Sequence, residues 1–100
     1  MLTSKDRSYL KKIASNEQCV YQIGKDALGE AVVNGISQAI NARELVKINV
    51  LQNCDSDIRE LAQSLSEMID CEIVTTLGRK IILYKFNPKN KNHVLQNNLK

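Results

Sequence analysis

Three segments of the chain repeat apolar residues with the period of an α-helix. Residues 4–16 carry a narrow apolar stripe after a capping residue, which is Thr3 or Ser4. Residues 28–41 repeat large aliphatic side chains at every fourth position. The stripes consist of Leu10, Ile13 and Ala14 in the first segment and of Leu28, Val32, Ile36 and Ile40 in the second. Both segments are predicted to be amphipathic helices.

The third segment has the clearest helical pattern. It follows a cap at Asp55 or Ser56, and residues 58–69 keep the spacing i, i+3, i+4, i+7. The inward residues are Ile58, Leu61, Ala62, Leu65, Met68 and Ile69, and the outward ones are Asp57, Glu60, Gln63, Glu67 and Asp70. This pattern predicts a core-facing helix with an acidic solvent face.

The segments between these helices have the patterns of β-strands. The predicted strands are residues 19–23, 44–51, 71–77 and 81–86. Alternation in the second of them places Val46, Ile48 and Val50 on one face. The short connection at residues 78–80 begins with glycine, so we expect an antiparallel hairpin with Arg79 and Lys80 near its tip.

This order of elements predicts an α/β fold, α-β-α-β-α-β-β. Each strand-helix-strand link is long enough for a crossover, so the first three strands should run parallel and the fourth antiparallel to the third. The expected result is a mixed four-stranded sheet with its helices packed on one face. Residues 1–87 should form one domain, and the Asn- and Lys-rich residues 88–100 a flexible basic tail.

Composition narrows the classes of function. The 100 residues are 43% hydrophobic and 25% charged, which is ordinary for a globular domain. The three cysteines are widely spaced, so we expect reduced thiols, with Cys19 and Cys71 as small core residues. The single histidine, His93, has no partner for a metal site. No nucleophile–base pair, metal set or phosphate loop is recognisable, which predicts a protein without enzymatic activity or cofactor.

The N-terminal residues 1–7 lack the apolar stretch of a signal peptide, and no run reaches the roughly 18 apolar residues of a membrane span. The protein is therefore expected to be cytoplasmic and to have no membrane partner. We also expect a monomer that has no small-molecule substrate.

Basic residues gather at the two ends of the chain and acidic residues in its middle. Residues 1–25 carry five Lys or Arg and two acids, and residues 78–100 carry six and none. Residues 52–77 carry one basic residue and six acids. The net charge of +3 thus conceals a basic surface that suits a polyanion. Because aromatic residues are few, recognition of the backbone and shape of folded RNA fits better than base stacking.

The turn after the first strand is the main candidate site. Gly24 breaks the strand, Lys25 supplies a cation, and the helix that follows would leave backbone N–H groups free at its positive end. This combination can hold a phosphate, although most strand-glycine-helix junctions only use the backbone freedom of glycine. In a parallel arrangement the Gly78 hairpin lies at the same edge of the sheet, so Lys25, Arg79 and Lys80 should form one basic edge.

Several segments together resemble the CRM domain (chloroplast RNA splicing and ribosome maturation) in its stand-alone bacterial YhbY-type form. They are Lys5-Asp6-Arg7 with Leu10 and Ala14, Gln22 to Leu28, Ala42 to Ile48, and Leu77 to Lys85. The resemblance covers roughly residues 2–86. It implies a fold similar to the C-terminal domain of translation initiation factor 3 and binding to RNA in precursors of the large ribosomal subunit. It also implies a KH-like GxxG loop at residues 24–27, in which Ala27 replaces the second glycine.

Two hypotheses follow. The first is an RNA-binding protein that associates with ribosomal RNA and assists assembly of the large subunit. Its expected RNA-binding residues are Gly24, Lys25, Asp26, Ala27, Lys5, Arg7, Lys11, Lys12, Lys47, Arg79 and Lys80. The alternative is a protein–protein interaction adaptor that uses the acidic third helix or an exposed face of the sheet.

Overall fold

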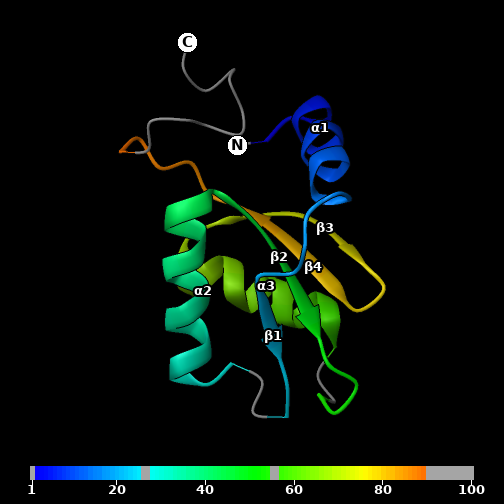
Figure 1. The fold of residues 1–100 in the computed structure, drawn as a ribbon, viewed down its shortest axis with the longest axis vertical. Helices are drawn as coiled ribbons and strands as arrows, with labels where there is room; N and C mark the ends of the chain where they lie inside the picture. The colour runs from blue at the N-terminus through cyan, green and yellow to red at the C-terminus, as the bar shows by residue number, and fades with distance from the viewer. Residues whose placement is uncertain (1, 26–27, 55–56, 90–100) are drawn as a thin grey trace.

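The computed structural model describes residues 2–25, 28–54 and 57–89. Helices and strands occur in the predicted order (Figure 1). They are α1 (Ser4–Ala14), β1 (Tyr21–Ile23), α2 (Glu30–Arg43), β2 (Leu45–Val50), α3 (Ile58–Ile69), β3 (Glu72–Leu77) and β4 (Lys80–Tyr84). The α/β class and the order of elements predicted from the sequence are therefore confirmed.

The four strands form one mixed sheet in the order β1-β2-β4-β3. β1 and β2 are parallel, and β4 is antiparallel to both β2 and β3, as the sequence predicted for the last two strands. β3 runs in the direction of β1 and β2 but does not pair with β2, because β4 lies between them. β4 takes this central place because Ile81, Ile82 and Leu83 are fully buried and need cover on both faces of the sheet.

The larger core lies between the sheet and the helices α2 and α3. Val46, Ile48 and Val50 point into it, which confirms the predicted face of β2. The helices contribute Ile36 and Ile40 from α2 and Leu61, Ala62, Leu65 and Ile69 from α3. The prediction that helices pack on one face holds for these two, and their stripes supply most of the apolar surface that is buried.

Helix α1 covers the opposite face and closes a second, smaller core. Leu10 and Ala14 pack there with Leu45, Val74, Ile82 and Tyr84. These strand residues are apolar on the face that the larger core does not use, so α1 is needed to exclude water from them. α1 contacts β3 and β2, and in Figure 1 it lies away from α2.

The helix ends correct some expectations. Thr3 caps α1 in a capping box, in which Asp6 N–H donates to Thr3 Oγ1 (3.0 Å) and Thr3 N–H to Asp6 Oδ2 (3.2 Å). The cap of α3 is Asp57, whose Oδ1 accepts from Arg59 N–H (3.4 Å), so the predicted caps at residues 55–56 were wrong. Those two residues lie outside the described part of the chain.

Two predictions of burial were also wrong. Met68 is 59% exposed, because at about 100° per residue it falls at the margin of the buried stripe of α3. Among the cysteines, Cys54 is the buried one; Cys71 is half-buried and packs against the larger core, and Cys19 is only half-buried. Cys54 follows the end of β2 and packs in the larger core.

Candidate functional site

The C-terminal ends of β1 and β2 and the hairpin between β3 and β4 lie at one end of the sheet (Figure 1). Ile23 pairs with Val50, and Val50 N–H donates to the carbonyl of Arg79 (2.7 Å). β1 and β4 are two strand spacings apart, so their backbones are separated by about 10 Å here. The predicted meeting of the Gly24 turn and the Gly78 hairpin at one edge is confirmed.

Lys25 and Lys80 are exposed at this end of the sheet. Gly24 sits between the end of β1 and the turn that follows β2, where a β-carbon on Gly24 would lie 3.6 Å from Asn53 Oδ1 and 3.6 Å from Leu51 Cδ1. These are ordinary van der Waals distances, and Gly24 is not in the left-handed region. The fold itself therefore does not require glycine at this position.

The helix after this turn starts later than predicted. Its first residue is Glu30 and its cap is Gly29, so Lys25 precedes the helix by several residues. A phosphate at Gly24 would consequently be held by the loop and Lys25 rather than by the first N–H groups of α2. The other two predicted loop residues, Asp26 and Ala27, lie outside the described residues.

Asn53 belongs to the same end of the sheet and was missed in the sequence. Its exposed carboxamide lies beside Gly24 and carries both a donor and an acceptor. In the sequence the Gln52-Asn53 pair is only a turn signal, and no local pattern links it to Gly24, which is about thirty positions away. We refer to Gly24, Lys25, Asn53 and Lys80 together as the sheet-end site.

The side chain of Arg79 folds back on the protein. Its Nε donates to the carbonyl of Val50 (2.9 Å), and its Nη2 donates to those of Leu51 (2.6 Å) and Cys54 (3.1 Å). The guanidinium thereby satisfies three carbonyls of the turn that carries Asn53. Arg79 holds the sheet-end site in shape, and most of its donors point inward.

Two other predicted RNA contacts are engaged in the same way. Arg7 Nη1 donates to the carbonyl of Ile73 (2.8 Å), which ties α1 to β3. Lys47 Nζ donates to the carbonyls of Ala14 (3.1 Å) and Glu17 (3.4 Å), at the negative end of the α1 dipole. Both cations stabilise the docking of α1 on the sheet.

Lys5, Lys11 and Lys12 are exposed on α1. Leu10 of this helix packs near Leu45 and Tyr84, which pair with each other where β2 begins and β4 ends. Since the sheet-end site lies where β2 ends, the α1 lysines form a second basic cluster at some distance from it. The structure thus divides the predicted cations into two exposed groups and three that bind backbone carbonyls.

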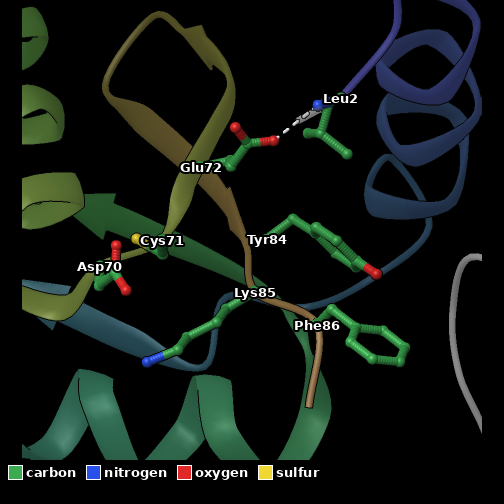
Figure 2. A pocket seen from close by; sticks show the side chains of 7 residues that line it. All are labelled: Leu2, Asp70, Cys71, Glu72, Tyr84, Lys85 and Phe86. Atoms are coloured by element: carbon green, nitrogen blue, oxygen red, sulfur yellow. Dashed lines mark hydrogen bonds between the residues drawn. The ribbon is translucent and has the colours of Figure 1, made fainter. Parts of the chain in front are cut away.

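A cavity of about 390 Å³ lies at the opposite end of the sheet from Gly24 (Figure 2). Two of the polar groups around it are engaged: Leu2 N–H donates to Glu72 Oε2 (2.8 Å; Figure 2), and Lys85 Nζ donates to the carbonyl of Ile69 (3.0 Å). Burial raises the pKa of the Cys71 thiol to about 11, so the thiol stays protonated and unreactive at neutral pH. This arrangement offers no activated nucleophile.

Within the described residues, no group of three or more His, Cys, Asp or Glu side chains could hold a metal ion. The acids Glu60, Glu67 and Asp70 are exposed on or at the end of α3, as the sequence predicted. No helix in the described part of the chain is long and apolar enough to cross a membrane.

Comparison with known proteins identifies the family. The model of the CRS1 / YhbY (CRM) domain matches residues 2–85, which is most of the chain. The protein belongs to the CRM family. The match includes the Gly24 turn, the β3–β4 hairpin and the basic helix α1, and so confirms the resemblance that the sequence motifs carried.

Relatives of similar length bear names that state RNA binding. A Bacillus subtilis protein named "Probable RNA-binding protein YqeI" is 36% identical over 91 residues, covering 91% of this chain and 95% of the relative. A Haemophilus influenzae protein named "RNA-binding protein" is 28% identical over 85 residues, covering 84% and 85%. The solution structure of a hypothetical protein from Staphylococcus aureus has a TM-score of 0.78 and 40% identity, covering 91% of this chain and 95% of that one.

Proposed function

We propose that the protein binds ribosomal RNA in precursors of the large ribosomal subunit and assists their assembly in the cytoplasm, without enzymatic activity. Membership in the CRM family carries this proposal, and relatives that cover nearly the whole chain are named as RNA-binding proteins. The cations of the chain, exposed at the sheet-end site and along α1, supply the electrostatic attraction that RNA binding needs.

The sheet-end site supports contact with the RNA backbone. Gly24 lacks a side chain where the fold would accept one, so the bare backbone is available for close approach of a phosphate. Lys25 is the next residue in the chain, and Lys80 is exposed at the same end of the sheet, two strands away. The Asn53 carboxamide can hydrogen-bond a base edge or a ribose hydroxyl.

The binding test uses purified protein and a transcript of large-subunit ribosomal RNA over a series of salt concentrations. The Lys25→Ala/Lys80→Ala variant should weaken binding, and the slope of log affinity against log salt should fall by about 0.7 to 0.9 for each phosphate that is no longer neutralised. Lys89→Ala removes an exposed cation beyond the sheet and serves as the control. Equal reductions of affinity in both variants would mean nonspecific attraction, and unchanged binding in the double variant would reject the sheet-end site.

The assembly role needs a cellular test. Crosslinking the protein in cells and sequencing the attached RNA should recover precursor sequences of the large subunit, and the protein should sediment with precursor particles. If only unrelated RNAs are recovered, the protein binds RNA but the proposed role in large-subunit assembly is rejected.

The alternative is a protein–protein adaptor that uses the acidic face of α3. Met68, 59% exposed between acidic neighbours, is the observation in its favour. A protein partner bound through apolar contacts should respond little to added salt, whereas RNA binding should weaken steeply. The salt series therefore separates the two functions.

A further inference from the structure

The outer edge of β3 differs from an ordinary sheet edge. β3 is the last strand in the order β1-β2-β4-β3, so no strand of the described residues pairs with its outer side. The strand is irregular, because its register with β4 shifts between Ile73 and Thr75. The guanidinium of Arg7 already occupies the Ile73 carbonyl (2.8 Å). A bulge and an occupied acceptor make this edge a poor template for a further strand.

An open groove of about 320 Å³ runs along this edge. Its polar lining consists of Arg7 from α1, Arg59 and Gln63 from α3, and Thr75 and Thr76 from β3. Because α1 and α3 cover opposite faces of the sheet, each face contributes one guanidinium to the groove.

The chemistry of this lining suits an anion. Two guanidinium groups and the Thr76 hydroxyl supply hydrogen-bond donors, while the Thr75 hydroxyl and the Gln63 carboxamide already donate within the protein; no carboxylate of the described residues lines the groove. Arg7 is held in place by Ile73, which leaves other N–H groups of its planar fork for a ligand. Among the α3 acids, Glu67 accepts a hydrogen bond from Gln63 Nε2 (3.2 Å), and Glu60 is exposed beside Arg59 in the sequence.

The groove also adjoins the sheet-end site. Thr76 is followed by Leu77, which pairs with Lys80. Thr75 and Leu77 are separated by about 7 Å along the strand. A chain of phosphates that contacts Lys80 could therefore continue along β3 toward Arg7.

We propose that this β3 edge groove binds phosphates of an RNA strand, as a second contact beside the sheet-end site. The inference rests on the proposed RNA-binding function and adds Arg59 and the β3 threonines to Arg7, which the sequence had already predicted as an RNA contact. Arg59 and Arg7 bind the phosphate oxygens, and the Thr76 hydroxyl is a further donor, whereas the Thr75 hydroxyl donates to the Thr76 carbonyl (3.5 Å).

The test uses Arg59→Gln, because Arg59 is exposed and the removal of its charge should not affect folding. The matched control is Arg43→Gln, the same substitution at an exposed arginine on α2. Binding to a large-subunit ribosomal RNA transcript is measured against salt. The expected results for Arg59→Gln are affinity lower by roughly threefold to tenfold and a salt slope lower by about 0.7 to 0.9. Arg43→Gln should behave as the unsubstituted protein.

A second measurement locates the contact. Titration of isotope-labelled protein with the same RNA should shift the backbone amide signals of Thr75 and Thr76 as well as those of Gly24 and Lys25. These shifts should be weaker in Arg59→Gln at equal RNA concentration.

Three outcomes would overturn the inference, and they are distinguishable. If Lys25→Ala/Lys80→Ala weakens binding but Arg59→Gln matches Arg43→Gln, the groove is rejected and the proposed function stands. If the unsubstituted protein does not bind the RNA, both fail. If the Thr75 and Thr76 signals move with protein concentration in the absence of RNA, the edge pairs with a second copy of the chain instead.

Discussion

A cationic side chain is available to bind RNA only when it does not already donate to groups of the protein, and Arg79 illustrates this most clearly. Arg79 and Lys80 are neighbours in the sequence with the same charge. Lys80 is exposed, whereas the guanidinium of Arg79 donates to three carbonyls at the end of β2. Replacing either residue would reduce charge, but only the replacement of Arg79 leaves backbone acceptors without their donor.

Arg79→Ala is expected to lower the free energy of unfolding by about 1–3 kcal/mol, because three carbonyls lose a charged donor. Lys80→Ala should change it by less than about 0.5 kcal/mol, as is usual for an exposed side chain. Urea denaturation of both variants checks this difference. In Arg79→Ala the amide signal of Asn53 should also move, since its turn loses an anchor; equal stability of the two variants would contradict the positioning role.

Gly24→Ala should fold with nearly unchanged stability, since a β-carbon meets its neighbours at 3.6 Å and the backbone is not left-handed. The same substitution at Gly78 should cost about 1 kcal/mol, because φ there is +58° and alanine is strained in that region. Thermal unfolding compares the two variants. If RNA needs the bare backbone of Gly24, binding falls in Gly24→Ala although the fold is intact, and preserved binding would argue against close approach at this residue.

The Cys71 thiol gives a pH dependence whose sign follows from its burial. Its pKa rises from 9.0 to about 11 in the folded protein, so between these values the unfolded chain loses a proton that the folded protein keeps. The stability of the folded state should therefore fall as pH rises from about 9 to about 11. Denaturation of Cys71→Ala over the same range is the control, because lysines and tyrosines also titrate there. An identical pH dependence in the variant would show that Cys71 contributes nothing.

At the scale of elements, the junction of α2 and β2 anchors the chain segment that follows β4. Glu44 ends α2 with φ at +68°, a strained value for a side chain other than glycine. Its main-chain oxygen accepts from Lys85 N–H (2.8 Å), and its buried carboxylate accepts from Asn87 N–H (2.9 Å). Asn87 Nδ2 donates in turn to the carbonyl of Asn41 (2.7 Å). These contacts fix residues 85–87 on the end of α2.

A chain truncated after Asn87 should therefore keep these contacts and unfold within a few degrees of the full chain. Truncation after Tyr84 removes the Lys85 and Asn87 donors from Glu44, whose carboxylate is buried. It should therefore lower the melting temperature, by about 4–8 °C for each kcal/mol by which the free energy of unfolding falls. Thermal unfolding of the two shortened chains tests this expectation. A large destabilisation on truncation after Asn87 would show that residues beyond it contribute to the fold.

At the scale of the whole molecule, the exposed cations and the acids of α3 lie on different parts of the surface. The sheet-end site lies where β2 ends, the α1 lysines are exposed on the helix that covers one face of the sheet, and the acids lie on the solvent side of α3, which covers the other face. Alternation along β4 puts Lys80 on the face of Ile82 and Tyr84, which α1 covers, so an RNA that touches Lys80 can continue toward the α1 lysines, whereas the acids of α3 on the other side would repel it.

Lys5→Ala/Lys11→Ala/Lys12→Ala removes the exposed cations of α1 without disturbing its buried stripe. If RNA reaches this cluster, the salt slope should fall by about two units and affinity should drop at low salt. Circular dichroism checks that the helix is retained. An unchanged slope would confine the RNA to the sheet-end site and its surroundings.

The sequence by itself determined the order of the elements, the buried faces of α2, α3 and β2, and the β3–β4 hairpin. These features follow from periodicity and turn residues, which are local properties of the chain. It also located the Gly24 turn, and its motifs carried the resemblance to the CRM family that the family match confirmed.

Tertiary structure alone decided the place of β4 between β2 and β3, the position of α1 on the opposite face, and the separation of exposed cations from engaged ones. Strand order depends on which strand has apolar side chains to bury on both of its faces. Whether a lysine or arginine side chain is exposed or bound to the protein depends on backbone carbonyls that distant segments contribute. The placement of Asn53 beside Gly24, and of Arg59 in one groove with Arg7, is of this kind. Such neighbours arise only when remote parts of the chain fold together, so no local pattern encodes them.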